Sequence, residues 1–321
     1  MKRLVRSLAA IATVLAFAQG AIAAYPENVV KIVVPQTPGG GTDLLARLIA
    51  QRLSVRWGQS VVVENRPGAG DVIGLEFVAK GAPDGYTLLM SSDGPQAINV
   101  SLYKSLPYDA INDFTPIASV GSISFLIATD NNSPARTFTD FVKLSQANSG
   151  LTFGSAGNGS LNHLIGEMIN QSTGMQLRHV PYKGASPAIS DLLGGHVSSV
   201  VASVPSIATQ LDAGKLRALA VTSAKRSSRL PNVPTIPEFG YPQFGVSPWI
   251  GLLGPAKMSA EVVKKINADV NAILAEPEVK KAILAEGMEP FAGTPSEFAD
   301  LVKSDIPKWG GVVRKANIRI D

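Results

Sequence analysis

The sequence contains no cysteine and few aromatic residues, and each shortage excludes a class of function. Without cysteine there can be no disulfide, no thiolate nucleophile and no zinc site built on cysteine. Aromatic residues make up only 6% of the chain, too few for the stacking surfaces that bind single-stranded nucleic acid. The stability of the protein must therefore come from its hydrophobic core alone.

Charge is also sparse, and long apolar runs are missing from most of the chain. Charged residues make up 17% and hydrophobic residues 45%, the balance of a globular protein rather than a disordered one. Beyond the N-terminus, no apolar stretch approaches the roughly 20 residues that span a bilayer. A chain of 321 residues exceeds what one hydrophobic core usually supports, so we predict two compact units.

The N-terminus is different, because it has the pattern of a secretory signal peptide. Three basic residues among the first six precede an apolar run at 8–17, and Ala21 and Ala23 form a small-x-small cleavage pattern. We predict a cleaved signal peptide at 1–23, because the apolar run is too short for the alternative, a membrane anchor. Removing its three cations from the 29 Lys and Arg residues leaves one more than the 25 Asp and Glu residues. A nearly neutral mature chain gives no electrostatic reason to expect nucleic-acid binding.

The rest of the chain alternates β-branched runs with amphipathic segments. The predicted fold class is α/β, with two lobes that each hold a mostly parallel sheet flanked by helices. The chain is expected to cross between the two units at 231–248, which is rich in Pro and Gly. A second crossing is expected near 120–125. Residues 24–123 plus 247–321 are expected to form lobe 1, and 124–246 to form lobe 2. Strands are expected at 29–34, 61–63, 86–90, 125–128, 151–153, 177–180, 197–202 and 216–221.

Helices are expected at 42–55, 259–275 and 295–304, and a shorter one begins at Pro187. Ser259 is predicted to cap the second of these helices, and Ser186 to cap the short one. The first helix is expected to bury one apolar face, formed by Leu44, Leu45, Leu48, Ile49 and Leu53.

The first candidate for chemistry is a glycine-rich loop at 35–43, with the sequence PQTPGGGTD. Glycines between a strand and a helix let the backbone approach a ligand closely, and the helix start offers unpaired N–H groups and a positive dipole end. These features predict an anion site, in which Thr42 caps the helix or reaches the ligand and Asp43 has a structural role. An ordinary tight turn is the open alternative.

Two nucleotide-binding motifs do not fit this loop. A Walker motif requires a lysine after Gly41, and the chain has none there. A dinucleotide motif requires a third glycine where Leu44 stands.

A second glycine-rich loop at 153–160, FGSAGNGS, precedes another helix. Because a two-lobed fold can bring one such loop from each lobe to a shared cleft, the pair favours a ligand site over two unrelated turns. Charge-assisted hydrogen bonds contribute about 1.5–3 kcal/mol each, so three or four would give affinity near micromolar without any Arg or Lys.

Ser160 and His163 lie on one helical face and raise the alternative of a hydrolase. The nucleophile elbow needs Gly-x-Ser-x-Gly, however, and the residues around Ser160 lack both glycines at those places. His179 and His196 are far apart and have no clustered carboxylates, so no metal site is expected. We expect no cofactor and no enzymatic activity.

Asp93 follows a predicted strand in the segment SSDGPQ at 91–96. At the C-terminal edge of a sheet it would meet the distal end of a ligand. The alternative is an ordinary turn aspartate.

Taken together, these motifs resemble the Bug-type, or tripartite tricarboxylate transporter, substrate-binding proteins. The resemblance covers essentially the whole mature chain. It is carried by PGGGTDLLAR at 38–47, ENRPGAG at 64–70, LPYDAINDFTPIA at 106–118, FGSAGNGSLNHL at 153–164, VPYKGASPAISDLLGGHV at 180–197, GKLRALAVTSAKRSSRLPNVPT at 214–235 and GLLGPA at 251–256.

The resemblance implies a two-lobe, type II periplasmic-binding-protein fold with a hinge. It also implies that both glycine-rich loops grip one carboxylate through backbone amides, hydroxyls and ordered water. The residues implied are Pro38, Gly39, Gly40, Thr42 and Asp43 in the first loop, and Ser155, Ala156, Gly157, Asn158, Ser160 and His163 in the second.

The chain departs from the family after Gly194 and Gly195. Where many members resemble Val-Asp-x-x-Phe-Asp, residues 197–202 read VSSVVA, so both acids are missing. If the second acid faces the cleft in those members, its absence argues against a ligand that carries an ammonium group. Asp93 and Gln96 stand at positions that vary in the family, which leaves the distal specificity open.

The function expected is that of a monomeric periplasmic protein that captures a mono- or dicarboxylate between its lobes. It would deliver the ligand to the membrane subunits of a tripartite tricarboxylate transporter. The alternatives are a solute sensor that acts on a signalling receptor and, less favoured, a hydrolase that uses Ser160 and His163.

Overall fold

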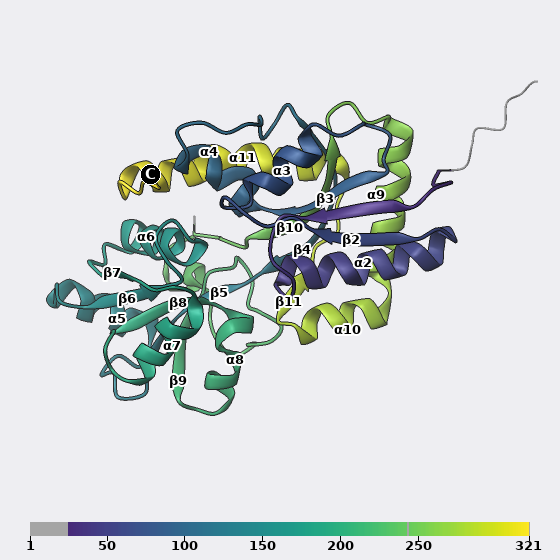
Figure 1. The fold of residues 1–321 in the computed structure, drawn as a ribbon. Helices are drawn as coiled ribbons and strands as arrows, with labels where there is room; N and C mark the ends of the chain where they lie inside the picture. The colour runs from purple at the N-terminus through teal and green to yellow at the C-terminus, as the bar shows by residue number, and fades with distance from the viewer. Residues whose placement is uncertain (1–24, 243, 321) are drawn as a thin grey trace, which may run out of the picture.

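The computed structural model describes residues 25–242 and 244–320, which fold into two α/β lobes lying side by side (Figure 1). The predicted signal peptide at 1–23 lies outside the described residues. The chain leaves the first lobe between β4 (Phe114–Ile123) and β5 (Phe125–Asp130) and has returned by β10 (Trp249–Pro255). The lobe boundaries predicted at 123/124 and 246/247 fall in these two connections, and they stay a prediction.

The first lobe is built on a six-stranded sheet with the order β11-β4-β10-β3-β1-β2. Its helices α2, α9 and α10 pack on one face, and α3 and α11 pack on the other. The remaining strands are β1 (Val30–Val34), β2 (Val61–Asn65), β3 (Thr87–Ser92) and β11 (Met288–Pro290). The helices are α2 (Gly41–Trp57), α3 (Val72–Ala79), α9 (Ala260–Ala275), α10 (Pro277–Ala285) and α11 (Pro295–Lys315).

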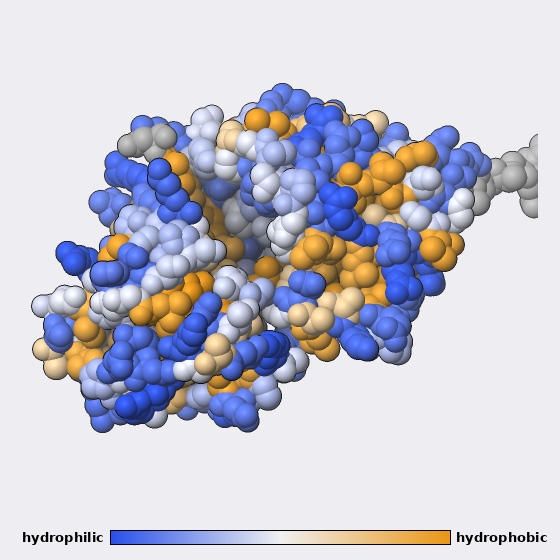
Figure 2. Space-filling view, turned by 60° about the horizontal axis from the view of Figure 1, so that its bottom comes forward, coloured by the Kyte–Doolittle hydropathy of each residue, from blue (hydrophilic) through white to orange (hydrophobic). Residues whose placement is uncertain are grey.

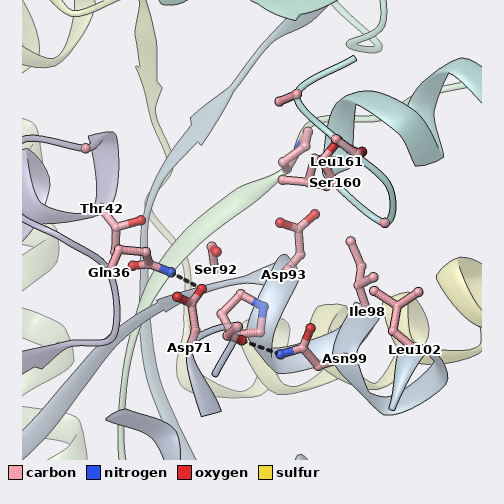
Figure 3. A pocket seen from close by; sticks show the side chains of 18 of the residues that line it. Gln36, Thr42, Asp71, Ser92, Asp93, Ile98, Asn99, Leu102, Ser160 and Leu161 are labelled. Carbon is pink, nitrogen blue, oxygen red and sulfur yellow. Dashed lines mark hydrogen bonds between the residues drawn. The ribbon is translucent and has the colours of Figure 1, made fainter. Parts of the chain in front are cut away.

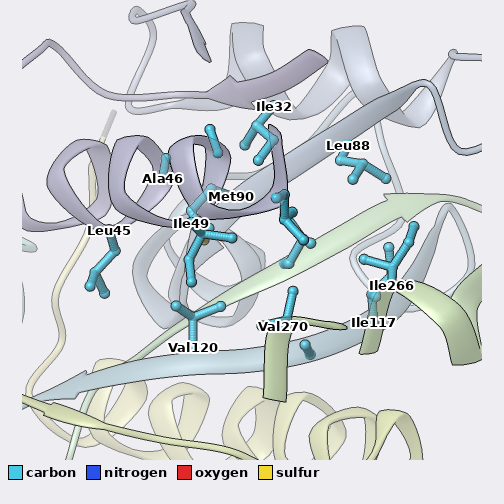
Figure 4. Packing of buried hydrophobic residues seen from close by; sticks show 14 of the residues in the cluster. Ile32, Leu45, Ala46, Ile49, Leu88, Met90, Ile117, Val120, Ile266 and Val270 are labelled. Atoms are coloured by element: carbon cyan, nitrogen blue, oxygen red, sulfur yellow. The ribbon is translucent and has the colours of Figure 1, made fainter. Parts of the chain in front are cut away.

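Side chains along the strands of this sheet point alternately to its two faces, and they form a hydrophobic core on each face. Ile32 and Leu88 belong to the core beneath α2 and α9, which Figure 4 shows, whereas the adjacent Val33 and Leu89 belong to the core beneath α3 and α11. Successive side chains of a strand point to opposite faces, so a continuous apolar run supplies both cores at once. The runs of aliphatic residues in β1 and β3 are therefore typical of strands covered on both faces.

The second lobe has a five-stranded sheet with the order β7-β6-β8-β5-β9. Helices α5 and α6 cover one face, and α7 and α8 cover the other. The strands are β6 (Thr152–Ser155), β7 (Arg178–Pro181), β8 (Ser199–Ser203) and β9 (Leu216–Val221). The helices are α5 (Phe138–Ala147), α6 (Leu161–Thr173), α7 (Ala185–Leu193) and α8 (Val204–Asp212).

The two-lobed α/β class agrees with the sequence, but the expectation of mostly parallel sheets is wrong, because each sheet is mixed. The pairs β1–β2, β1–β3, β6–β7 and β6–β8 are parallel. The strands β10 and β5 pair with both of their neighbours in the antiparallel sense, as β11 does with β4. In the first lobe this follows from the chain path, since β4 leaves the lobe and β10 re-enters it in the opposite direction. Adjacent strands of this kind need no crossover helix.

The two predicted helix caps have different outcomes. Ser259 caps α9 as predicted, accepting a hydrogen bond from the backbone N–H of Val262 at 3.2 Å. The cap predicted at Ser186 is wrong, because α7 begins at Ala185 and its N-cap is Gly184, which has no side chain to accept a hydrogen bond. The predicted face of α2 also needs a correction, since Leu44 is 38% exposed and does not share the buried face.

The final helix, α11, reaches from the first lobe over the second. Phe298 and Val302 near its start pack beneath the first sheet, whereas Trp309 and Val312 pack with residues of the second lobe. Figure 1 shows its C-terminal end lying above α6. The helix extends well beyond the predicted 295–304, through Pro307 inside it. None of the helices in the described residues is long and apolar enough to cross a membrane.

Candidate functional site

A cavity of about 490 Å³ lies between the lobes, with both glycine-rich loops in its wall. Figure 2 shows that the surface is hollowed between the two halves of the molecule, with hydrophobic residues beside the hollow. From the first lobe, Gly40, Gly41 and Thr42 line the cavity, and the second lobe contributes residues 156–161. The convergence expected from the sequence is therefore present in the structure.

The first loop ends as the N-terminus of α2, with Gly40 as its N-cap. A Cβ atom added to Gly40 would meet nothing within 4 Å, so the missing side chain leaves cavity space open rather than relieving a clash. Gly39 has a φ of 91°, a conformation that favours glycine. The first-turn N–H groups of α2 therefore lie at the cavity without covering side chains on Gly40 or Gly41, as an anion site requires.

Asp43 holds this loop from beneath rather than lining the cavity. Its carboxylate accepts hydrogen bonds from the backbone N–H of Gly39 at 2.9 Å, from the guanidinium of Arg47 at 2.9 and 3.0 Å and from the amide of Asn65 at 2.9 Å. Burial acts to raise the pKa of Asp43, but these hydrogen bonds outweigh it and hold the pKa below its usual value. An ionised Asp43 thus fixes the loop, which is the structural role predicted for it.

The second loop ends as the N-terminus of α6, with Ser160 as its N-cap. The Ser160 hydroxyl accepts a hydrogen bond from the backbone N–H of His163 at 3.3 Å and donates to the carbonyl of Gly157 at 2.7 Å. Inside the turn, Ser155 Oγ accepts from the backbone N–H of Gly157 at 3.1 Å. Side-chain hydroxyls therefore set the curvature that exposes residues 156–160 to the cavity.

Two stacked histidines support the second loop from behind. The rings of His163 and His179 lie 3.6 Å apart at an interplanar angle of 9°. His163 Nδ1 accepts a hydrogen bond from the backbone N–H of Gly159 at 3.1 Å, and His179 Nε2 lies 2.6 Å from Ser155 Oγ. Burial lowers the pKa of both rings to about 4, and for His163 the charge of His179 adds to the effect. Both rings are therefore neutral near pH 7.

Ser160 and His163 do not form the nucleophile–base pair proposed for a hydrolase. Ser160 Oγ contacts the backbone N–H of His163 rather than its ring, and the Nδ1 atom of that ring is occupied by Gly159. A catalytic serine needs a hydrogen bond to the base that removes its proton.

The cavity floor contains residues that the sequence analysis did not select as ligand contacts. Gln36 donates to the carboxylate of Asp71 at 2.7 Å, and Asn99 donates to the carbonyl of Gly70 at 2.8 Å (Figure 3). Gly70 has a φ of 61°, and an added Cβ would clash with the hydroxyl of Tyr103. The ENRPGAG motif and the asparagine after the Asp93 segment were the available signals for this floor.

Asp93 also lies in the cavity wall, at the entrance to a π-helical turn, Gly94–Ile98, that continues into α4 (Asn99–Leu102). The residue is 1% exposed, and neither carboxyl oxygen has a side-chain hydrogen-bond partner among the described residues. The backbone N–H groups of Asp93 and Gly94 lie close enough to lower its pKa slightly. Burial, reinforced by the charge of Asp305 and opposed by that of Lys308, raises the pKa of Asp93 to about 8. An ordinary turn aspartate is exposed and hydrogen-bonded, so that alternative does not describe Asp93.

The predicted site residues divide into two groups. Residues on the cavity wall are Gly40, Thr42, Asp93, Ala156, Gly157, Asn158 and Ser160. Residues outside the cavity lining are Pro38, Gly39, Asp43, Ser155 and His163. The last four of these shape the loops through the hydrogen bonds described above.

The profile of the tripartite tricarboxylate transporter family receptor matches residues 45–318. The chain belongs to this family. Protein BugT of Bordetella pertussis is 37% identical over 298 residues, which cover 92% of this chain and 91% of that protein. Family members are periplasmic solute-binding proteins rather than enzymes, and the resemblance found in the sequence is therefore confirmed.

Two solved structures of relatives contain bound acids. The R. palustris protein Rpa4515 with adipate is 35% identical, has a TM-score of 0.78, and aligns over 92% of this chain and 100% of that one. MatC from Rhodopseudomonas palustris with bound malate is 30% identical, has a TM-score of 0.73, and aligns over 90% of this chain and 100% of that one. The two-lobed fold of periplasmic binding proteins is thus confirmed.

Proposed function

We propose that this protein is a periplasmic solute-binding protein that captures a small carboxylate in the cavity between its lobes. One observation carries the proposal: two helix N-termini, those of α2 and α6, meet at one cavity through loops without bulky side chains. Each N-terminus supplies roughly half a positive charge and unpaired N–H donors, so together they favour one carboxylate.

The direct ligand contacts in this proposal are the cavity-lining residues Gly40, Thr42, Ala156, Gly157, Asn158 and Ser160. Charge-assisted hydrogen bonds of about 1.5–3 kcal/mol each offset the ordering cost of the ligand and still allow micromolar binding. Relatives that hold adipate and malate support a carboxylate as the ligand class.

The proposal includes export and delivery. The signal-peptide pattern at 1–23 would place the protein in the periplasm, and the family implies delivery to the membrane subunits of a tripartite tricarboxylate transporter. The sensor alternative shares this capture step and differs only in the receiver. Uptake measured in a strain without this protein separates the two, because loss of a delivery protein stops uptake through the transporter, whereas loss of a sensor leaves the transporter working.

The capture step is tested by a thermal-shift screen of refolded, ligand-stripped protein against mono-, di- and tricarboxylates. A ligand at 100-fold excess over its Kd stabilises the folded state by about 2.7 kcal/mol and raises Tm accordingly. If sugars and amines without a carboxylate raise Tm and no acid does, the proposal is wrong.

The site is tested with Gly40→Val. Because the space around the Gly40 Cβ position is open and its φ is −78°, the variant should fold normally yet fill the place of the ligand carboxylate. We expect binding to be lost with little change in the Tm of the unliganded protein. The matched control is Gly311→Val in α11, where an added Cβ also meets nothing within 4 Å, and it should bind normally. Retained affinity in Gly40→Val would place the ligand elsewhere.

A further inference from the structure

The cavity wall combines groups of opposite electrostatic character. The N-termini of α2 and α6 favour an anion. The carboxyl groups of Asp71 and Asp93 line the same cavity, and no Lys, Arg or His is among the described residues that line it. A single ligand carboxylate held by the two loops leaves these two acids without a counter-charge.

Asp93 is a buried acid without a partner. Figure 3 shows its carboxyl group pointing across the cavity toward the second loop, where Ser160 and Leu161 lie. Neither of its oxygens accepts a hydrogen bond from a side chain of the described residues. Buried polar groups are normally paired, so an unpaired carboxyl at a ligand cavity indicates that a donor on the ligand completes it.

The protein's own nearby cation is already engaged. On α11, Asp305 and Lys308 face Asp93, but Lys308 Nζ lies 3.2 Å from Asp305 Oδ1. The other oxygen of Asp305 accepts a hydrogen bond from the indole N–H of Trp249 at 2.9 Å. Asp305 is thus satisfied within the protein, and Lys308 forms its ion pair with Asp305, while its charge lowers the pKa of Asp93 only in part.

Asp71 adds a second carboxyl to the cavity wall. It immediately precedes α3 and accepts a hydrogen bond from Gln36 at 2.7 Å, while burial raises its pKa. Part of the cavity wall is apolar, with Ile98, Leu102 and Ile250 among its residues.

We propose that the solute is zwitterionic, with its carboxylate held by the two glycine-rich loops, an apolar body and a protonated nitrogen that donates to Asp93 near Asp71. The proposal rests on the proposed capture of a carboxylate. It assigns to Asp71 and Asp93 the counter-charge that residues 197–202 do not supply. At pH 8 and above, where at least half of Asp93 is ionised, a second carboxylate beside these acids would require a proton to be taken up, whereas a protonated nitrogen would meet an ionised partner.

Calorimetric titration of the stripped full chain with matched sets of ligands tests the inference. Each set contains an ω-amino acid, the dicarboxylate and the monocarboxylate of equal chain length, such as 6-aminohexanoate, adipate and hexanoate; α-amino acids are measured beside them. We expect the tightest amino acid to bind at least tenfold more tightly at pH 8 than the matched di- and monocarboxylates. If a dicarboxylate binds as tightly as its matched amino acid, the zwitterion is wrong and carboxylate capture stands. If no carboxylate of any class binds, both proposals fail.

The pH dependence gives a second readout with opposite signs for the two ligand classes. Because the pKa of Asp93 is raised to about 8, a protonated nitrogen binds only after this carboxyl loses its proton. Its affinity should therefore be about 50-fold weaker at pH 6 than at pH 8. A dicarboxylate should bind more weakly at pH 8 than at pH 6, and this result for the tightest ligand would overturn the proposal.

Asp93→Asn tests the residue itself. The amide keeps the shape of the side chain but removes the charge, so amino acids should lose at least tenfold in affinity at pH 8 while monocarboxylates lose nothing. Unchanged monocarboxylate binding also shows that the variant is folded. The control Asp300→Asn removes the same charge from an exposed position on α11 and should leave all affinities unchanged. Equal loss for both ligand classes would contradict the assignment.

Discussion

The two glycine-rich loops present the same kind of backbone donors to the cavity but are held in place by opposite means. The first depends on an ionised carboxylate, Asp43, bound by Arg47, Asn65 and a loop amide. The second depends on two neutral, stacked rings, His163 and His179. Neither support is itself in the cavity lining. The contrast shows that groups with different charge states can shape an anion site, provided that they hold the loop backbone in place and do not line the cavity themselves.

The largest effect should come from acid, which acts on the second loop first. The folded pKa of each stacked histidine, about 4, lies below its ordinary value of 6.5, so the unfolded chain binds protons first as pH falls. Stability is therefore full above pH 6.5 and is lost between pH 6.5 and 4, by up to about 3 kcal/mol for each ring. Asp43 has a lowered pKa, so its contribution is lost only below its ordinary value of 3.8.

Urea unfolding at pH 6.5, 5.5 and 4.5 measures this loss. His179→Gln keeps a polar group beside Ser155 but removes one titrating ring, so about half of the pH dependence should disappear. If the variant loses as much stability as the wild type over this range, the histidine pair is not the cause.

A smaller effect should be the difference in destabilisation between two Gly→Ala substitutions, one in each loop. Gly159 has a φ of 74° and an added Cβ would lie 2.6 Å from Ile320, whereas Gly39 has a φ of 91° and an added Cβ meets nothing within 4 Å. Gly159→Ala combines backbone strain with a clash and should cost about 2 kcal/mol, against about 1 kcal/mol for strain alone in Gly39→Ala. Urea unfolding of both variants at pH 7 measures the difference, and equal costs would show that Ile320 moves freely.

The smallest effect should come from removing the cation of the first loop. Arg47 is about half exposed, so Arg47→Met should destabilise the protein less than Gly39→Ala does. Because 1 M salt screens exposed charges, the difference between Arg47→Met and wild type should shrink there. Thermal unfolding at low and high salt is the measurement. A difference that persists in 1 M salt would mean that the packing of the arginine stem, and not its charge, holds the loop.

The sequence predicted those features that depend on neighbouring residues. Both glycine-rich loops, the strands before them and the helices after them are local patterns, so their positions could be predicted closely. Strand β10 was missed because Gly251, Gly254 and Pro255 give it the composition of a loop, while burial on both faces removes any alternation. Its antiparallel position between β3 and β4 depends on where the chain re-enters the lobe.

The cavity floor could be predicted only in part for the same reason. Gln36 and Asp71 are 35 positions apart, and their hydrogen bond exists only because the sheet places β1 beside the start of α3. Asp93 was recognised as a candidate from the sequence. That Asp93 lacks a cationic partner could not be predicted, because Lys308 on α11 forms its ion pair with Asp305 instead. Chain segments so distant meet only in the folded molecule, and no local pattern predicts such contacts.

Helix α11 has a mechanical consequence for any opening of the cleft. Its first half is anchored beneath one sheet by Phe298 and its second half is anchored against the other lobe by Trp309. A rotation of one lobe against the other must therefore bend α11 or separate its last turns from the second lobe. Pro307 stands between the two anchors and has no N–H to donate, so bending there breaks no hydrogen bond of its own.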